Sequence, residues 1–258
     1  MKLNLSTRAL AHHLETHTTI DSTNARAKEL AKDQAPHGSC VVAHAQTAGR
    51  GQRNRHWASP AGAGLYASFL VRPKLEPQHT PLLTLATAVA ACDAIAEVSG
   101  YRPGIKWPND LLDPTSKKKL AGILVEASSS AAQINHAIIG IGINLKPDAF
   151  PEPLQNYAVA LNTLSSSPSE PSALLSALAN QLEPWLDRLQ NGLSEPLIEA
   201  WRHRAIGIGQ EVSFIDDDDH IQGHLDGIAP SGGLIIAGKT YYSGELRLPG
   251  APLRPLDD

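Results

Sequence analysis

Two apolar stretches between residues 117 and 145 restrict the possible folds more than any other part of the sequence. The first is Leu120-Ala-Gly-Ile-Leu-Val and the second is Ile139-Gly-Ile-Gly-Ile-Asn-Leu. Each has the length and composition of a buried strand. The polar residues 127–132 between them are enough for a short turn only. Since short turns join antiparallel neighbours, the sequence predicts an antiparallel meander over residues 117–145.

Helices and further strands are predicted around this meander. Residues 80–100 form the clearest helix, because Thr80 can cap it, Pro81 suits the first turn and Gly100 stands just past its end. Other helices are expected at 25–32, at 174–192 with a kink or a break at Pro184, and at 195–204. Strands are expected at 39–44 and 65–72. The mixture predicts an α+β fold.

The composition changes at residues 206–209, after which short β runs dominate. Strands are expected at 211–215, 221–225, 234–237 and 245–248. Short strands with tight turns predict a small SH3-like barrel, so we expect domains 1–205 and 206–258. Four consecutive aspartates, residues 216–219, lack the alternating ligand spacing of an EF-hand and are expected to form a solvated turn.

Composition narrows the class of protein. The formal net charge of −4 argues against general nucleic-acid binding, which usually requires a basic domain. The two cysteines, Cys40 and Cys92, make no disulfide framework and are expected to be small buried side chains in a reducing cytoplasm. We expect neither a signal peptide nor a membrane-spanning segment. The first residues lack the pattern of a signal peptide, and no apolar run approaches the roughly 20 residues that cross a bilayer.

The loop at residues 46–57 carries the strongest sign of ligand binding. It holds Arg50, Arg53 and Arg55, two glycines and a final tryptophan, but no acidic residue. Guanidinium groups match phosphate and carboxylate oxygens, and glycines let backbone N–H groups approach the same anion. The loop therefore predicts a small-anion site in which Trp57 could cover a nucleobase. A mobile basic surface loop is the alternative.

Two other features suit a ligand site. Gly140 and Gly142 face the same side of one strand, which leaves either a slot for a flat ring or a bulge in the strand. Residues 21–24 precede a helix. They can cap it, and they can also present hydroxyl and N–H groups to a ligand.

Five motifs then occur in a fixed order along the chain. They are Ser22-Thr-Asn24, Gln46-Thr-Ala-Gly-Arg-Gly-Gln-Arg-Asn-Arg-His-Trp57, Lys106-Trp-Pro-Asn-Asp110, Lys119-Leu-Ala-Gly-Ile-Leu124 and Gly140-Ile-Gly-Ile-Asn144. In this order and spacing the sequence resembles the biotin–protein ligases, also called biotin–[acetyl-CoA-carboxylase] ligases. The resemblance covers residues 18–146, and the small C-terminal β region fits it too.

The resemblance implies a class II synthetase-like catalytic fold, with a mixed or antiparallel sheet flanked by helices. It also implies the activity: biotin and ATP give biotinyl-5′-AMP and pyrophosphate, and biotin then passes to a lysine of the biotin carboxyl carrier protein of acetyl-CoA carboxylase. Mg²⁺ accompanies ATP, with no protein ligand for the metal identified. Homodimers are common in the family. Two-function members carry an N-terminal DNA-binding module. The sequence starts too late for one, so we expect no specific shift of operator DNA.

The resemblance also assigns roles to residues of this sequence. Lys106, between the biotin carboxylate and the α-phosphate, and Arg50 are the expected catalytic residues. Biotin is expected to contact Ser22, Thr23, Asn24, Gln46, Gly49, Arg50, Gly51, Gln52, Lys106, Gly140 and Gly142. ATP and the adenylate are expected to contact Arg53, Arg55, Trp57, Asn109, Lys119 and Asn144. Two alternatives stay open at this point: a lipoate or octanoate ligase or transferase, and a biotin-sensing protein without turnover.

Gln52 departs from the family pattern, in which a further arginine often follows Gly-Arg-Gly and helps to retain the adenylate. We hypothesise that Arg50, Arg53 and Arg55 retain it in this chain. Replacing Gln52 by arginine should then leave the release of free biotinyl-adenylate nearly unchanged in a single-turnover assay. A large fall in release would contradict the hypothesis.

Overall fold

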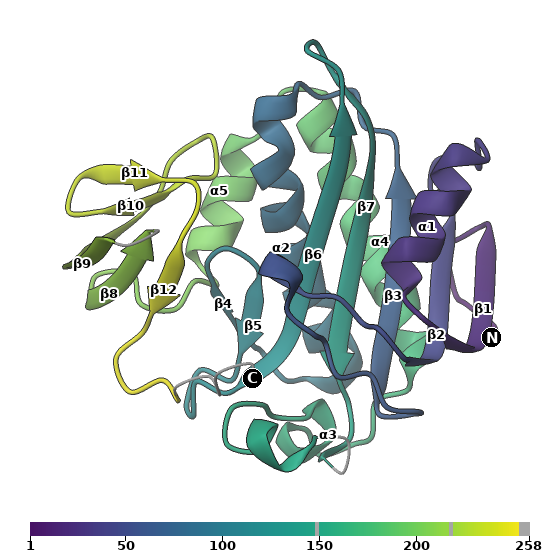
Figure 1. Ribbon diagram of the computed structural model, residues 1–258, viewed down its shortest axis with the longest axis horizontal. Coiled ribbons are helices and arrows are strands. Elements are labelled where there is room, and N and C mark those ends of the chain that lie inside the picture. Colours follow the sequence, from purple (N-terminus) through teal and green to yellow (C-terminus); the bar gives the residue numbers. More distant parts are fainter. Residues whose placement is uncertain (148–149, 217–218, 253–258) are drawn as a thin grey trace.

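The computed structural model describes residues 1–147, 150–216 and 219–252. Its centre is a seven-stranded sheet in the order β1-β2-β3-β7-β6-β5-β4 (Figure 1). The first strand pairs parallel to the second and the other pairs are antiparallel, so the sheet is mixed. The strands are β1 (Leu14–Ile20), β2 (Cys40–Gln46), β3 (Gly64–Val71), β4 (Gly104–Lys106), β5 (Asp110–Leu112), β6 (Lys119–Ser129) and β7 (Ile134–Asn144).

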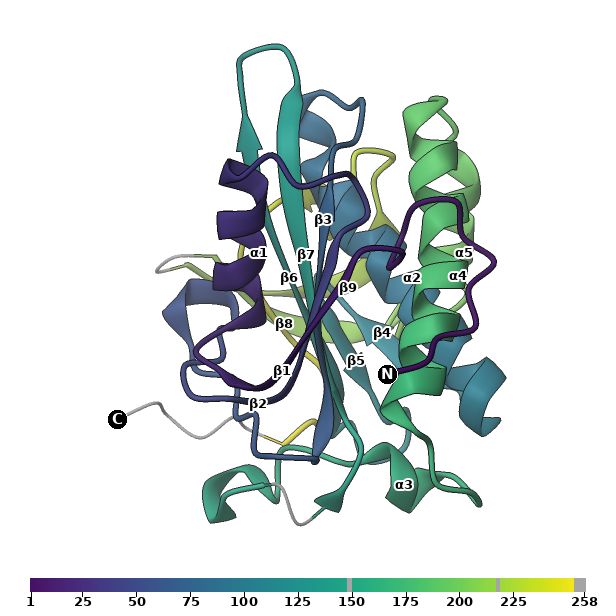
Figure 2. The same cartoon turned by 90° about the vertical axis from the view of Figure 1, so that its right-hand side faces the viewer.

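Helices cover both faces of this sheet, as Figure 2 shows. One face carries α1, and the other carries α2 and α4, which pack against each other. The helices are α1 (Thr23–Lys32), α2 (Thr80–Ser99), α3 (Leu161–Leu164), α4 (Pro171–Gln190) and α5 (Glu195–Arg202). This arrangement confirms the predicted α+β class and the antiparallel pairing predicted over residues 117–145, which β6 and β7 form.

A second sheet of five antiparallel strands follows, in the order β11-β10-β9-β8-β12. Its strands are β8 (Glu211–Asp216), β9 (Asp219–Ile228), β10 (Leu234–Ile236), β11 (Lys239–Tyr241) and β12 (Glu245–Arg247). Trp107 joins the two sheets: its Nε1 donates to the Gly232 carbonyl at 3.1 Å, and its ring lies 6.1 Å from that of Phe214. Two of the four aspartates, Asp217 and Asp218, lie outside the described residues. The division at residue 205 stays a prediction.

The structure corrects two expectations about the helices. Of the kink or break predicted at Pro184, the break is wrong, because α4 continues through that residue. Proline removes one hydrogen bond to the Asn180 carbonyl. Buried leucines and Trp185 continue the apolar face beyond it, so packing against α2 holds the helix together. The other correction concerns a membrane span, which was not expected. The helical residues Pro77–Ser99 are long and apolar enough to span a membrane, with a mean hydropathy of 1.6. However, 67% of their most apolar window is buried inside the fold.

Both cysteines match their prediction. Cys40 and Cys92 are buried and unpaired. Burial raises the pKa of each thiol, so both stay protonated and behave as small apolar side chains.

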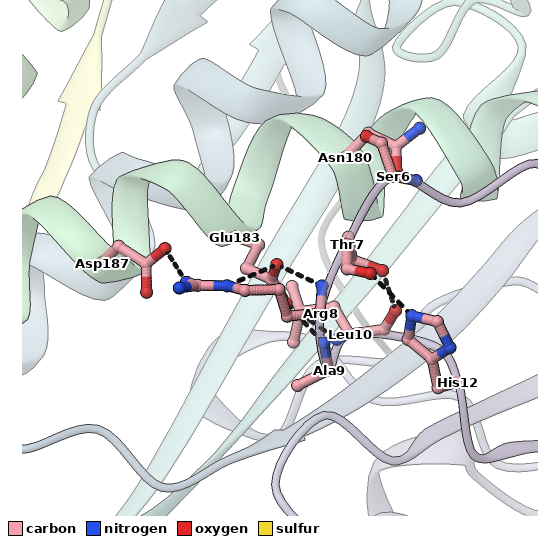
Figure 3. Close-up of polar contacts among 9 residues, drawn as sticks. All are labelled: Ser6, Thr7, Arg8, Ala9, Leu10, His12, Asn180, Glu183 and Asp187. Atoms are coloured by element: carbon pink, nitrogen blue, oxygen red, sulfur yellow. Dashed lines mark hydrogen bonds and ion pairs between the residues drawn. The ribbon is translucent and has the colours of Figure 1, made fainter.

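The N-terminal segment is held against α4 by several polar contacts, of which Glu183 makes the most (Figure 3). Glu183 accepts hydrogen bonds from the backbone N–H groups of Arg8, Ala9 and Leu10 at 2.6, 2.9 and 3.0 Å. The Arg8 guanidinium also pairs with Asp187 on the same helix. Burial tends to raise the pKa of Glu183, but the three N–H groups outweigh it and the pKa is lowered. The carboxylate thus holds the segment that leads into β1.

Replacing Glu183 by glutamine should lower the free energy of unfolding by about 2 kcal/mol at pH 7, because a buried ionic acceptor of three N–H groups is lost. A depressed pKa gives stability that is present above the unfolded-state value and lost as pH falls. The difference between the two proteins should therefore shrink below about pH 4. Urea denaturation at several pH values measures this. Equal unfolding midpoints at pH 7 would contradict the assignment.

Candidate active site

One pocket lies over the face of β6 and β7 that α1 also covers, beside the loop at residues 46–57. In Figure 1 the blue segment between β2 and β3 crosses in front of these strands. Strand β12 of the second sheet closes another side. The pocket brings together nearly all the residues predicted from the sequence: Ser22, Thr23, Asn24, Gln46, Arg50, Gly51, Gln52, Arg53, Arg55, Trp57, Lys106, Asn109, Lys119, Gly140, Gly142 and Asn144.

Gly49 is the predicted residue that stands apart from the pocket lining. It lies where the two arms of the loop meet. A Cβ there would come within 2.4 Å of the Trp57 carbonyl and 2.7 Å of Ser59 Oγ. The missing side chain allows Trp57 N–H to donate to the Gly49 carbonyl at 2.9 Å. Its role here is to close the loop.

One end of the pocket is polar and well ordered by hydrogen bonds. Ser22 caps α1, its Oγ accepting from Ala25 N–H at 3.4 Å. The Gln46 carboxamide accepts from Thr23 N–H at 2.8 Å and donates to Ser59 Oγ at 2.8 Å. The start of α1 and the end of β2 thus meet at this point, and Ser22, Thr23 and Gln46 line the pocket while they hold the two elements together.

The floor of the pocket is made of glycines under an indole ring. Gly142 of β7 pairs with Gly122 of β6, and the pairing is regular across both positions, so the bulge alternative is wrong. A Cβ at Gly142 would lie 2.4 Å from the Trp57 indole, and one at Gly140 would lie 2.1 Å from Asn24 Oδ1. Both predicted glycines therefore face the same slot, in which the Trp57 indole and the Asn24 amide pack directly on them.

The other end of the pocket is cationic. Asp110 lies between two lysines: its Oδ1 is 2.6 Å from Lys119 Nζ and its Oδ2 is 3.9 Å from Lys106 Nζ. Burial lowers the pKa of Lys106, and the Asp110 carboxylate opposes that shift. Lys119 Nζ also lies 5.3 Å from the centre of the Trp57 ring. A pair of nearly buried ammonium groups beside an apolar slot suits an anionic group that enters with a ligand.

Arg55 of the loop lies beside this end. Arg55 Nη2 lies 3.1 Å from Glu245 of β12, while Arg50, Gln52 and Arg53 are exposed. Burial tends to raise the pKa of Glu245, but the hydrogen bond and charge of Arg55 lower it. Residues 50–57 are folded back on themselves, with Gly51 N–H donating to the Arg55 carbonyl at 2.7 Å. The loop thus forms a wall of the pocket, as the ligand-binding hypothesis requires.

The two asparagines at the predicted nucleotide end have their amide groups engaged by the backbone. Asn109 Nδ2 donates to the Ile123 carbonyl at 2.7 Å, and Asn144 Nδ2 donates to the Lys119 carbonyl at 3.2 Å. Both line the pocket but hold β6 in place.

Several lining residues were missed from the sequence. Asp110 and Gly122 lie within two of the quoted motifs, which was the signal that could have identified them. Glu245 lies 190 positions beyond the arginine that it pairs with, so nothing in the local sequence connects them.

Comparisons with known proteins agree with this geometry. Residues 17–144 match the Biotin/lipoate A/B protein ligase family. The chain is 34% identical over 255 residues to the bifunctional ligase/repressor BirA of Bacillus subtilis, which covers 96% of this chain and 78% of that protein. It is 35% identical over 224 residues to the biotin–[acetyl-CoA-carboxylase] ligase of Paracoccus denitrificans, which covers 84% and 91%. The structure of biotin protein ligase from Aquifex aeolicus in complex with biotin and ATP superposes with a TM-score of 0.78 at 28% identity, over 91% of this chain and 97% of that one.

Proposed function

The chain belongs to the biotin/lipoate A/B protein ligase family, and we propose from its pocket how it uses biotin and ATP. The activity is ATP-dependent biotin–protein ligation, with biotin and ATP as substrates. One observation carries the proposal: a single pocket joins a polar end, a glycine-floored slot and a cationic end. Those three parts match the ring, the chain and the carboxylate of biotin, with room beside them for a nucleotide.

The reaction has two steps. The biotin carboxylate attacks the α-phosphorus of ATP, and pyrophosphate leaves with the electron pair of the broken P–O bond. A carrier lysine amine then attacks the acyl carbon, loses its proton, and AMP leaves. The first step brings two anions together, so positive charge must already be in place. Lys106 and Arg50 are the proposed catalytic residues because they can supply it without donating a covalent nucleophile.

The other proposed roles follow the arrangement of the pocket. Ser22, Thr23 and Gln46 hold the ureido ring at the polar end. The indole of Trp57 packs on the adenine. Arg53 and Arg55 bind the phosphates. Arg55 leaves its ion pair with Glu245 to do so, because the triphosphate carries more negative charge than the carboxylate.

Mg²⁺ fits this site as a companion of the nucleotide. The described ranges, 1–147, 150–216 and 219–252, contain no group of three His, Cys, Asp or Glu side chains that could hold a metal. Mg²⁺ binds phosphates and water with one or two carboxylates, and Asp110 is a carboxylate that lines the pocket. The ion would neutralise charge on the phosphates.

The finer assignments belong to the same proposal. The acceptor is a biotin carboxyl carrier protein, as the name of the Paracoccus relative suggests. The five-stranded second sheet is an SH3-like small barrel within a domain of residues 206–258. Two buried, unpaired thiols are consistent with a reducing cytoplasm. A homodimer is proposed from the family resemblance alone.

Thermal shift and turnover separate this function from its rivals. Biotin should raise the melting temperature and lipoate should not. Biotin-dependent exchange of pyrophosphate into ATP should be measurable. Lipoate binding without biotin binding would indicate a lipoate ligase or transferase, and biotin binding without exchange would indicate a sensor.

A further inference from the structure

Glu126 lies on β6 outside the pocket lining, yet it is bonded to a residue of the pocket. Its Oε2 accepts from Asn24 Nδ2 at 2.8 Å, and its Oε1 accepts from Lys28 Nζ at 2.5 Å. Burial tends to raise its pKa, but the hydrogen bonds from Lys28 and Asn24 and the charge of Arg50 lower it. The carboxylate is therefore ionised at neutral pH and can only accept hydrogen bonds.

This acceptor fixes the orientation of the Asn24 amide. Since Nδ2 must face Glu126, the oxygen Oδ1 must face Ser68, whose Oγ lies 2.6 Å away. Ser68 is fully buried and Asn24 is 5% exposed, so water cannot readily replace either partner. Gly140 makes the arrangement possible, because a Cβ there would lie 2.1 Å from Asn24 Oδ1.

The Gln46 amide is fixed independently at the other end. Its Oε1 accepts from Thr23 N–H at 2.8 Å, so its Nε2 faces Ser59. Four oxygens therefore form a row. The amide oxygens of Asn24 and Gln46 stand at its two ends, and the hydroxyl groups of Ser68 and Thr23 lie between them. Three contacts result: Asn24 to Ser68 at 2.6 Å, Ser68 to Thr23 at 2.8 Å, and Thr23 to Gln46 at 3.1 Å.

The row is one proton short. Each hydroxyl has one proton, so two protons serve three contacts. Ser68 cannot donate to both Asn24 and Thr23. The contact without a proton is the longest one, between Thr23 Oγ1 and Gln46 Oε1. Two oxygens with no proton between them repel least at the longest distance, and Gln46 Oε1 already accepts a hydrogen bond from the Thr23 N–H. Ser68 then donates to Asn24, and Thr23 donates to Ser68.

We propose that Glu126, acting through Asn24 and Ser68, makes this end of the pocket a hydrogen-bond acceptor that selects a ligand N–H. Thr23 and Gln46 both line the pocket and present oxygen lone pairs there. A cyclic urea supplies the missing proton through a ring N–H. A dithiolane ring has no N–H and leaves the contact unfilled. Glu126 and Ser68 are thus positioning residues for substrate choice, an inference that rests on the proposed biotin ligation.

The isosteric variant Glu126→Gln tests the direction of the row. A glutamine can donate to Asn24 Oδ1, so the Asn24 amide can turn and donate to Ser68. Three protons then fill three contacts without any ligand, and the acceptor is lost. The KM for biotin in ATP–pyrophosphate exchange should rise about tenfold, the effect of one lost hydrogen bond. The KM for ATP and kcat should not change.

The preference for biotin over its analogues separates the proposed role from a general loss of stability, which would weaken the binding of all these ligands equally. Two carbamate analogues of biotin are compared with biotin, each with one ring N–H replaced by oxygen. The unsubstituted protein should disfavour one analogue strongly, since a site built to bond an N–H rejects a ligand without it. In Glu126→Gln, and in the second variant Ser68→Ala, that preference should fall about tenfold. Lys28→Met keeps the carboxylate and is the matched control, with the preference unchanged.

An unchanged preference in both variants, or an equal loss of biotin and of both analogues, would overturn the inference. Absence of biotin-dependent exchange in the unsubstituted protein would overturn the proposed function as well, so the two failures are distinguishable.

Discussion

Replacing Lys106 by alanine is expected to lower the rate of biotin-dependent ATP–pyrophosphate exchange by about 100-fold or more, the usual effect of removing a charge-stabilising donor from a transition state. Lys106 Nζ is nearly buried at the cationic end of the pocket, 3.9 Å from Asp110. In the first step negative charge gathers on the α-phosphate as the carboxylate approaches. The loss should fall on kcat, because the polar end of the pocket is unchanged.

Two further measurements sharpen this expectation. Lys118→Ala, which removes an exposed ammonium one position from Lys119, is the matched control and should exchange normally. Burial lowers the pKa of Lys106, so the rate in the unsubstituted protein should fall as pH rises through that lowered pKa. Lys106→Arg keeps its charge and should move the fall to higher pH. A Lys106→Ala protein with the normal kcat would remove this lysine from the mechanism.

Replacing Gly142 by valine is expected to reduce exchange by about 100-fold through misplaced ligands, an effect that shifts of about 1 Å can produce. A Cβ at Gly142 would lie 2.4 Å from Trp57 Cε2 and Nε1, so the indole must leave its position. The valine would also fill the floor of the slot. Valine is favoured in strands, so β7 should form as before.

A neighbouring variant controls for damage to the strand. Ile143→Val alters the opposite face of β7, where Ile143 is fully buried in the core and outside the pocket lining, and should exchange normally. Isothermal titration with biotin measures the binding part of the effect. Normal biotin affinity in Gly142→Val would show that the slot lies elsewhere.

The sequence predicted those parts of the fold that are specified locally. Helix α2, with Gly100 just past its end, and the strands β6 and β7 follow from residues close in the chain. The predicted cap is wrong: Thr80 is the first residue of α2, and its Oγ1 donates to the Pro77 carbonyl at 2.7 Å. By contrast, β1 was not expected, because Leu14–Ile20 alternates weakly and forms a strand by pairing in parallel with β2. The continuity of α4 through Pro184 also depends on packing against α2, which no local pattern reveals.

For the site as well, the sequence predicted one part and the fold was needed for the other. The motifs identified the residues that line the pocket because each motif is compact in the sequence. The partners of those residues come from elsewhere in the chain. Arg55 meets Glu245 of the second sheet, and Asn24 meets Glu126 at a separation of 102 positions. Such contacts arise from the sheet topology, so they appear only when the fold is known.

Transfer of labelled biotin to a carrier domain tests the central claim most directly. The purified protein, a biotin carboxyl carrier domain and labelled biotin are incubated with and without ATP and Mg²⁺. The account predicts a covalent label on one carrier lysine only when ATP is present, with AMP and pyrophosphate formed in equal amounts. Carrier that stays unlabelled in the presence of ATP, or becomes labelled without it, would contradict the account.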